Sequence, residues 1–167
     1  GVYDQYSDDK NGTYYYLHSN DKLCLFMKDY AYADPEEETE GRAYTDDTIK
    51  DTADAYVGGA LGGDAGKYQY QKVEYQEQKR IYLVTYIRRM GDYITDDSLT
   101  VFLDEKGEVY AFSAMNRDRY DAFGVEDIDK ESLNHAMEAV ESGRYGLDDI
   151  RISMDSEMYG LIALLPQ

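Results

Sequence analysis

The sequence predicts an α+β fold in which helices pack on a sheet of antiparallel strands. Two segments show the apolar spacing of amphipathic helices, several others have the composition of strands, and clusters of turn residues separate them. In chain order the elements are a hairpin, a helix, four strands, a second helix and two strands. A helix followed by strands thus occurs twice. Either the second set is a degenerate helix-plus-hairpin unit, or the two terminal hairpins pack together and complete one larger domain.

The N-terminal region, residues 1–44, predicts a hairpin followed by an acidic loop. Residues 13–18 have the Tyr-rich composition of a strand, residues 19–21 are turn residues, and residues 22–28 form the return strand. Residues 34–41 hold a proline and five acidic residues and lack a hydrophobic period, which is typical of a solvated loop.

The first helix is expected over residues 45–61. Thr45 is a suitable N-cap, because its hydroxyl can accept a hydrogen bond from a backbone N–H of the first turn. Gly58 and Gly59 each weaken the helix by about 1 kcal/mol relative to Ala, and they would allow close packing on a sheet. The glycine pair at 62–63 ends the helix. The apolar positions at helical spacing are Ile49, Ala53, Tyr56, Val57, Ala60 and Leu61.

Four strands are expected after this helix. The apolar run at 81–87 is typical of a central strand, because it is rich in β-branched and aromatic residues. The polar groups at 91–92 and 95–97 are interpreted as a connection between strands. The expected strands span residues 68–77, 80–89, 98–104 and 108–115.

The turn at residues 104–107 leaves two strand registers open. Turn chemistry favours a three-residue loop, which pairs Asp104 with Glu108 and gives Gly107 a left-handed conformation. The apolar pattern favours a two-residue loop, because a shift of one residue moves side chains to the other face. That loop would gather on one face Leu99, Val101, Leu103, Tyr110 and Phe112.

The second helix is expected to begin after the N-cap Asp129 and to end at Gly143. Ile128 precedes the cap and can contact Leu133 as a hydrophobic staple. Residues 150–154 and 159–165 then predict a second hairpin, with its turn near residues 155–157. The apolar stripe of the helix is Leu133, Ala136, Met137 and Val140.

Composition restricts the function classes. The chain of 167 residues has a net charge of −18, which makes nucleic acid an unfavourable partner because phosphate binding relies on Lys and Arg. No apolar stretch approaches the length of a transmembrane segment. Nineteen Tyr residues and no Trp predict a Tyr-rich sheet surface, on which alternation separates Tyr15 from Tyr14 and Tyr16. Cys24 lies in an apolar run, so a buried and unreactive thiol is expected.

The charge is unevenly distributed, which indicates how the chain is organised. Residues 1–67 carry 15 acidic and 6 basic residues, residues 68–123 carry 10 and 8, and residues 124–167 carry 10 and 3. The nearly balanced middle third indicates a structural unit with acidic flanks. We therefore expect three segments: residues 1–44 with the hairpin and acidic loop, 45–122 with the first helix and its strands, and 123–167 with the second helix and hairpin.

The sequence offers no clear catalytic or metal-binding motif. His18 and His135 lack zinc-ligand spacing, and each is interpreted as structural. Residues 62–67 resemble a phosphate-binding loop but lack the required Gly at 61 and the hydroxyl residue at 68. Residues 7–18 begin like a calcium loop but end in His rather than Glu. We therefore predict no catalytic residues, no cofactor and no metal.

One stretch resembles a known family. The strand pattern of Tyr82–Tyr86, Gly91–Asp104 and Gly107–Val109 is similar to PepSY-like or cystatin-like modules of secreted and envelope proteins of Gram-positive bacteria. The resemblance covers about residues 45–115. It implies a helix followed by an antiparallel sheet that curves around it, in a non-catalytic extracytoplasmic domain that binds or restrains a peptidase. The Gln-x-Val-x-Gly signature of inhibitory cystatins is absent.

The sequence therefore predicts a secreted or cell-envelope domain that binds a protein or peptide and catalyses nothing. Two alternatives remain: a small-molecule-binding or enzymatic domain on a cystatin-like scaffold, and a structural or adhesive module of a larger surface protein. The expected functional face is the Tyr-rich sheet, including Arg88 and Arg89.

Overall fold

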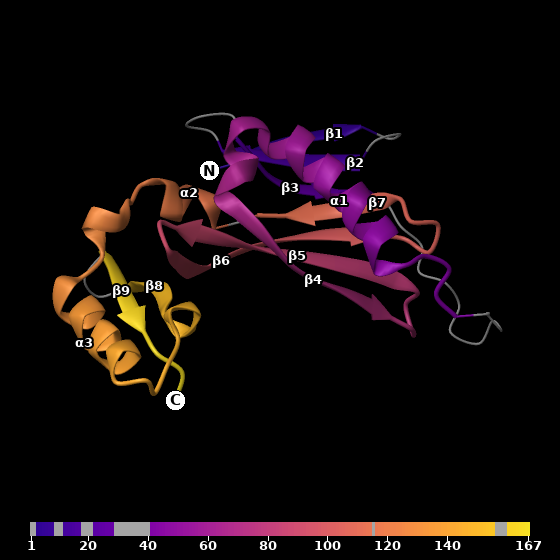
Figure 1. Cartoon of the computed structure of the whole chain (residues 1–167). Coiled ribbons are helices and arrows are strands. Elements are labelled where there is room, and N and C mark those ends of the chain that lie inside the picture. Colours follow the sequence, from indigo (N-terminus) through magenta and orange to yellow (C-terminus); the bar gives the residue numbers. More distant parts are fainter. Residues whose placement is uncertain (1–2, 9–11, 18–21, 29–40, 115, 156–159) are drawn as a thin grey trace. The chain divides into compact units, whose positions relative to one another are not determined.

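The computed structural model describes residues 3–8, 12–17, 22–28, 41–114, 116–155 and 160–167. In this part of the chain, a mixed, open sheet of nine strands is combined with three α-helices (Figure 1). The predicted α+β class is confirmed. The sheet is mixed rather than purely antiparallel, because β8 pairs with β6 in the parallel direction.

The element bounds are as follows. The strands are β1 (Tyr3–Asp8), β2 (Gly12–Leu17), β3 (Leu23–Met27), β4 (Tyr68–Gln76), β5 (Ile81–Met90), β6 (Tyr93–Leu103), β7 (Val109–Ser113), β8 (Arg151–Asp155) and β9 (Gly160–Leu164). The helices are α1 (Asp46–Leu61), α2 (Arg117–Asp121) and α3 (Lys130–Glu141), and 3₁₀ turns span Gly62–Lys67, Val125–Asp127 and Leu147–Asp149. The strand order is β1-β2-β3-β7-β6-β5-β4, with β8 on β6 and β9 on β8.

The chain divides into two compact units that interleave along the sequence. Unit 1 comprises residues 1–66, 70–86 and 99–115. Unit 2 comprises residues 67–69, 87–98 and 116–167. The two terminal hairpins belong to different units, with β1, β2 and β3 in unit 1 and β8 and β9 in unit 2.

Helix α1 lies across one face of the strands of unit 1 (Figure 1). Thr45 is the N-cap as predicted, because its side chain accepts a hydrogen bond from the Thr48 backbone N–H. The helix ends at Gly62, which has a φ of 58°. The face that it buries holds four of the predicted apolar positions, Ile49, Ala53, Val57 and Leu61.

Gly58 and Gly59 do not serve close packing. Both are exposed, and a Cβ atom added at either position would meet no atom within 4 Å. The expectation that they allow a close approach to the sheet is therefore wrong. The two glycines therefore lower the stability of the helix without improving its packing.

The predicted first hairpin forms between β2 and β3, which pair in the antiparallel direction. Strand β1, which pairs with β2, was not predicted. Its sequence Tyr-Asp-Gln-Tyr-Ser-Asp lacks the apolar alternation that marks a half-buried strand, so local composition favours a loop. Residues 18–21 and 34–40, where the turn and the acidic loop were predicted, lie outside the described residues.

The turn at residues 104–107 combines both predicted registers. The Asp104 N–H donates to the Glu108 carbonyl at 2.8 Å, as the three-residue loop requires, and Leu103 pairs with Val109. The register then shifts at a bulge next to Leu103, so that Val101 pairs with Phe112 as in the two-residue alternative. The bulge satisfies the turn chemistry and the apolar pattern together.

Strand β6 begins at Tyr93, five residues earlier than predicted. Residues 95–97 were expected in a connection because they are polar. Thr95 and Asp97 instead lie in the strand and are completely buried. The hydroxyl of Thr95 donates to the Arg88 carbonyl at 2.9 Å and accepts from the Asp97 N–H at 3.1 Å. The Thr95 hydroxyl and Asp97 Oδ2 find hydrogen-bond partners within unit 2, whereas Asp97 Oδ1 has none among the described residues.

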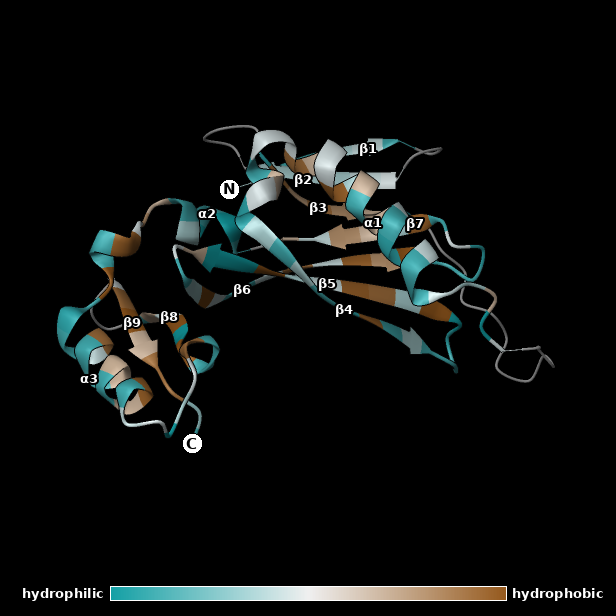
Figure 2. Ribbon diagram, viewed as in Figure 1, coloured by the Kyte–Doolittle hydropathy of each residue, from teal (hydrophilic) through white to brown (hydrophobic). Residues whose placement is uncertain are grey.

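Unit 2 forms its own core around α3 and the β8–β9 hairpin, which pairs as predicted. Asp129 caps α3, since its carboxylate accepts from the Ser132 N–H at 2.9 Å. Figure 2 shows hydrophobic residues along β8 and β9. It shows both hydrophilic and hydrophobic residues along α3. The short helix α2 was not predicted, because five residues carry no recognisable period. The buried core residues are Met90, Tyr120, Ile128, Ala136, Ile150, Ile152, Leu161 and Ala163.

Candidate functional site

A row of aromatic side chains crosses the first three strands of unit 1. The strand register places Tyr6 opposite Tyr14 and Tyr14 opposite Phe26, so these rings share one face of the sheet. The ring centroids lie 5.6 Å apart for Tyr6 and Tyr16, 6.5 Å for Tyr14 and Tyr16, and 4.7 Å for Tyr14 and Phe26. Tyr15 pairs with Leu25 and points to the opposite face, as alternation predicted.

The aromatic row continues from the sheet onto α1. The ring of Tyr56 lies 6.1 Å from Phe26 and 5.6 Å from Phe112. Exposure decreases along the row, from 57% at Tyr6 to 6% at Phe26 and 0% at Phe112. Burial raises the pKa of the Tyr56 hydroxyl above its ordinary value. The row therefore joins the exposed strand β1 to the core of unit 1.

Strand β1 is the last strand on its side of the sheet. Among the described residues, no strand pairs with its outer edge (Figure 1). Such an edge offers alternating backbone N–H and C=O groups in the geometry that a further strand requires. Its six residues include the exposed Tyr6 at the outer end of the aromatic row.

Among the described strands, β4 and β9 also have one edge without a strand partner. In unit 2 the outer edge of β9 is occupied by the start of α3: the Asp129 N–H donates to the Leu161 carbonyl at 2.8 Å, and the Ala163 N–H donates to the Ser132 hydroxyl at 3.0 Å. Strand β4 carries the exposed Lys72 and Glu74, which form an ion pair of 2.8 Å. Charged side chains on an edge strand oppose pairing. The outer edge of β9 is thus occupied, whereas β4 and β1 each carry both charged and aromatic residues.

A second aromatic cluster in unit 1 contains a stacked cation. The guanidinium carbon of Arg42 lies 5.4 Å from the ring centroid of Tyr82 and 5.8 Å from that of Tyr75. The Tyr82 hydroxyl accepts a hydrogen bond of 3.1 Å from the Tyr44 N–H. These contacts fasten the segment before α1 to the sheet, which is a structural role.

A polar triad also links α1 to the sheet. The Tyr86 hydroxyl donates to Asp54 at 2.6 Å, and Lys50 forms an ion pair with the same carboxylate at 2.5 Å. Burial, followed by the hydrogen bond to Asp54, raises the pKa of Tyr86. The hydrogen bond to Asp54 raises the pKa of Lys50, which stays charged. The triad fastens α1 to β5.

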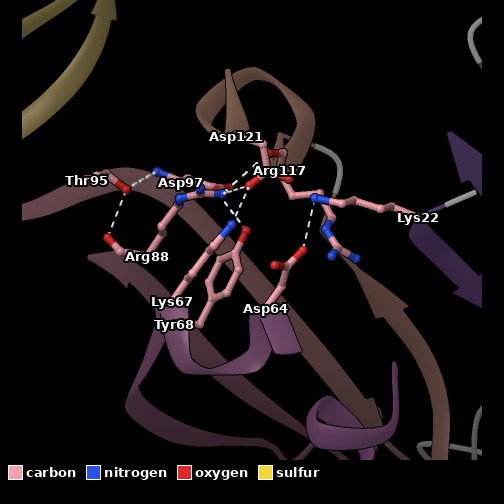
Figure 3. A network of polar contacts seen from close by, with 9 residues as sticks. All are labelled: Lys22, Asp64, Lys67, Tyr68, Arg88, Thr95, Asp97, Arg117 and Asp121. Carbon is pink, nitrogen blue, oxygen red and sulfur yellow. Dashed lines mark hydrogen bonds and ion pairs between the residues drawn. The ribbon is translucent and has the colours of Figure 1, made fainter. Parts of the chain in front are cut away.

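Unit 2 contains a buried ionic network (Figure 3). Asp97 has no exposed surface, and its Oδ2 accepts a hydrogen bond of 2.7 Å from the Tyr68 hydroxyl and lies 3.7 Å from Arg88 Nη1. Arg88 Nη1 also lies 2.7 Å from Asp121 Oδ1, which in turn lies 3.5 Å from Lys67 Nζ. The network joins β4, β5, β6 and α2 through residues that are distant in sequence.

The electrostatics of this network follow from burial. Desolvation raises the pKa of Asp97, while Tyr68 and Arg88 lower it to a smaller extent. Burial also raises the pKa of the Tyr68 hydroxyl. Arg88 is enclosed, with 5% exposure, so it does not lie on an exposed sheet surface. Arg89 donates to Gln69 at 3.0 Å and to the Asp92 carbonyl at 2.8 Å. Both arginines hold unit 2 together.

A shallow groove of about 350 Å³ lies along α3. Its lining is confined to the helix and the turn that follows it. His135 is exposed and lines this groove. The groove is open to solvent and its polar side chains are exposed. The lining residues are His135, Glu138, Ala139, Ser142 and Arg144.

The remaining residues singled out in the sequence are placed as follows. Cys24 is fully buried, and its thiol contacts the Lys22 carbonyl at 3.6 Å. Residues 62–67 form a 3₁₀ turn after α1. His18 lies outside the described residues. The sequence indicated the Tyr-rich hairpin but not β1, because the two Tyr residues of β1 are three positions apart and give no strand-like alternation.

Within the residues that the structure describes, no group of three or more His, Cys, Asp or Glu side chains is placed to hold a metal ion. No helix of this part of the chain is both long and apolar enough to cross a membrane. Comparison with known proteins gives no match among family models, curated proteins or solved structures. The candidate site, formed by β1 and the aromatic row beside it, therefore stands on its own geometry.

Proposed function

We propose that this protein is a non-catalytic binding domain that takes up an extended segment of a partner protein as an additional strand on β1. The observation that carries the proposal is the outer edge of β1, which has no described strand beside it and bears the exposed ring of Tyr6. Backbone hydrogen bonds to this edge would contribute to the affinity whatever the sequence of the bound segment. The aromatic row would supply contact area for alternate side chains of the segment.

The pairing of the neighbouring strands supports this role. Strand β1 pairs with β2 over its whole length, from Tyr3 opposite Leu17 to Asp8 opposite Gly12. The next strands connect β1 to the buried residues Phe26 and Phe112. An edge that is already extended and held in place loses little conformational freedom when a segment binds. This favours binding by strand addition over folding on binding.

The broader setting of the proposal comes from the sequence. The resemblance of residues 45–115 to PepSY-like and cystatin-like modules supports an extracellular or cell-envelope location and a peptidase-related partner. The arrangement of α1 on the strands of unit 1 is compatible with a cystatin-like domain. The proposal therefore includes an extracellular or cell-envelope location and a peptidase-related partner.

A peptide probe tests the proposal directly. The chain has no Trp, so the fluorescence of a peptide Trp reports binding without background from the protein. We expect acetyl-Thr-Val-Thr-Trp-Thr-Val-Thr-amide to bind and to shift the backbone amide NMR signals of residues 3–8. Tyr6→Ala should weaken binding about 2- to 10-fold, the range that aromatic contacts give. Tyr15→Ala is the matched control on the opposite face and should leave affinity unchanged.

N-methylated peptides separate strand addition from other modes. A strand at an edge uses only every second amide, so N-methylation of one alternating set should abolish binding and methylation of the other set should not. Equal tolerance of both sets would contradict the proposal. Amide shifts confined to residues away from β1 and β2 would also contradict it.

A further inference from the structure

We propose that the rings of Tyr6 and Tyr16 are a site of oxidative modification, at which a one-electron oxidant joins them by a carbon–carbon bond. The product, dityrosine, would fasten β1 covalently to β2. This inference goes beyond the proposed function and does not depend on it. It gives a chemical consequence to the composition of the chain, which has nineteen Tyr residues and no Trp.

The two rings already meet across the strands. Tyr6 pairs with Tyr14 and Asp4 pairs with Tyr16, so Tyr6 and Tyr16 are diagonal neighbours on one face of the sheet. Their ring centroids lie 5.6 Å apart and their planes meet at 80°. In this arrangement, carbon atoms at the rim of one ring face the other ring. Coupling joins ring carbons, and an exposed ring such as that of Tyr6 rotates freely enough to bring them together.

Solvent access distinguishes this pair from other tyrosine pairs of the fold. Tyr6 is 57% exposed and Tyr16 is half-buried, so an oxidant in solution reaches the pair. Tyr82 and Tyr86 are only 1% and 4% exposed. Burial shields a phenol from the oxidant and disfavours the loss of its proton. Three ring contacts contain one of these two buried residues: Tyr44–Tyr82, Tyr75–Tyr82 and Tyr70–Tyr86.

Tyr14 is a competitor for coupling to Tyr16. The centroids of these two rings lie 6.5 Å apart, and the planes differ by 23°. Stacked rings present their faces to each other, which keeps the rim carbons apart. The Tyr14 ring also stacks on Phe26 with centroids 4.7 Å apart, and Phe26 is buried. The geometry therefore favours Tyr6 over Tyr14 as the partner of Tyr16.

The reaction balances with hydrogen peroxide as the oxidant and a haem peroxidase as the electron carrier. Each phenol gives up one electron and its hydroxyl proton, which leaves two neutral phenoxyl radicals. The radicals combine at the ring carbons beside the hydroxyl-bearing carbons and form one carbon–carbon bond. The hydrogen on each coupled carbon then moves to the phenoxyl oxygen, which restores both hydroxyl groups. Two electrons and two protons thus leave the protein and convert one hydrogen peroxide into two water molecules.

The other oxidisable side chains compete little with these tyrosines. The chain has no Trp, and its one thiol, Cys24, has no exposed surface. Met27 is 52% exposed, but its oxidation by peroxide adds an oxygen atom to sulfur and gives the sulfoxide. That reaction is separate from the coupling of phenoxyl radicals and is recognised by its gain in mass.

The charge and the pairing of the strands favour a bond within one molecule. Two chains of net charge −18 repel each other, whereas the β1–β2 register holds Tyr6 and Tyr16 together over six residue pairs. The bond would close a loop over residues 6–16. Because a cross-link restricts the unfolded chain, we expect the cross-linked monomer to unfold at a higher urea concentration than the untreated protein.

Treatment of the full chain with a haem peroxidase and hydrogen peroxide tests the inference. Dityrosine fluorescence reports the product, a denaturing gel separates bonds within a chain from bonds between chains, and mass spectrometry of a digest identifies the joined residues. The variants are Tyr6→Phe and Tyr16→Phe, which keep the ring but cannot form the phenoxyl radical. Tyr15→Phe is the matched control, because Tyr15 lies on the opposite face of the same strand as Tyr16. Circular dichroism establishes that each variant is folded.

We expect the wild type and Tyr15→Phe to stay monomeric and to yield a joined pair of peptides that contains Tyr6 bonded to Tyr16. The pair should be lighter than its two separate peptides by the mass of two hydrogen atoms. Tyr6→Phe and Tyr16→Phe should each lose this product and most of the dityrosine fluorescence. The mapping of the bond in the wild type does not rely on any variant.

Several results would overturn the inference. A wild type that forms no dityrosine, or forms it only between chains, would show that the contact of the two rings does not lead to coupling. A bond mapped to another tyrosine pair, or undiminished fluorescence in Tyr6→Phe, would show that a different pair reacts. None of these results bears on strand addition at β1, which is measured with peptides and without oxidant.

Discussion

The Tyr68 hydroxyl donates a 2.7 Å hydrogen bond to Oδ2 of Asp97, a carboxylate without exposed surface. The two residues lie 29 positions apart, at the start of β4 and in the middle of β6. Arg88 approaches the same oxygen at 3.7 Å. This arrangement holds a charged group inside unit 2, and its consequences for stability can be measured.

The pH dependence of stability should contain a contribution from Asp97. Burial raises its pKa in the folded state above the unfolded value, so the folded state holds this proton more strongly. The contribution of Asp97 to stability is therefore present below the unfolded pKa, near 4, and is lost as pH rises through the folded pKa. We expect the stability of the wild type relative to Asp97→Asn to fall with increasing pH in this window.

Urea unfolding of both proteins at a series of acidic pH values measures this difference. Asp51→Asn serves as the control, because Asp51 is exposed. A constant difference between wild type and Asp97→Asn across the series would mean that the folded and unfolded pKa values of Asp97 are equal.

Arg88→Met should destabilise the protein by about 3–5 kcal/mol, the usual cost of removing one partner from a buried ion pair. The substitution leaves Asp97 and Asp121 without their shared cation. The double variant with Asp97→Asn should recover part of the loss, because one buried charge is then removed. Chemical denaturation measures both values. A loss of less than about 1 kcal/mol, the level of an exposed salt bridge, would show that the network is solvated.

Ser132→Ala should destabilise unit 2. The substitution leaves the Ala163 N–H without the hydroxyl that accepts its 3.0 Å hydrogen bond. An unsatisfied buried donor costs about 1–3 kcal/mol. Ser98→Ala, at an exposed position, should change stability by less than about 0.5 kcal/mol. Amide hydrogen exchange should quicken at Ala163 in the first variant, and unchanged exchange there would argue against the bond.

Two glycine substitutions should have opposite effects. Gly58→Ala should stabilise α1 by about 0.5–1 kcal/mol, because the position is helical and a Cβ there meets no atom within 4 Å. Gly107→Ala should destabilise by about 1–2 kcal/mol, because Gly107 has a φ of 76° and its added Cβ would lie 3.3 Å from the Tyr44 ring. Thermal unfolding of the two variants measures both effects. A change of Tm in the same direction for both would contradict the strain expected at Gly107.

Alkaline pH should destabilise the fold through its buried tyrosines. Burial raises the pKa of Tyr120 from 10.0 to about 12. The folded state therefore keeps this proton while the unfolded state loses it, so stability is lost as pH rises from 10 through 12. We expect Tyr120→Phe to flatten this decline. Urea unfolding of the wild type and Tyr120→Phe at a series of pH values from 9 to 12 measures the difference, and parallel declines in the two proteins would contradict the contribution of Tyr120.

Much of the secondary structure could be predicted because its signals are local. The caps of α1 and α3 are set by Thr45 and Asp129, each of which bonds a backbone N–H three residues later. The β2–β3 and β8–β9 hairpins follow from strand-like runs next to turn residues. The aromatic face of β2 follows from alternation alone.

The parts of the fold that could not be predicted depend on contacts between residues that are far apart in the sequence. Residues 95–97 resemble a loop until Arg88 and Tyr68 are placed beside them. Strand β1 has little apolar character of its own, and its pairing with β2 gives it a fixed face. The candidate site could not be predicted either. It consists of an edge and a face of β1, and these are defined only when β1 pairs with β2.

The sequence by itself determined the class of fold, the ends of the two longer helices, the hairpins and the acidic charge, because each depends on neighbouring residues or on composition. The tertiary structure alone decided which polar residues are buried, where the β6–β7 register shifts, and which described strands lie at the edges of the sheet. These depend on pairing between residues far apart in the chain. Hydrogen bonding and desolvation, rather than local propensity, set the outcome there.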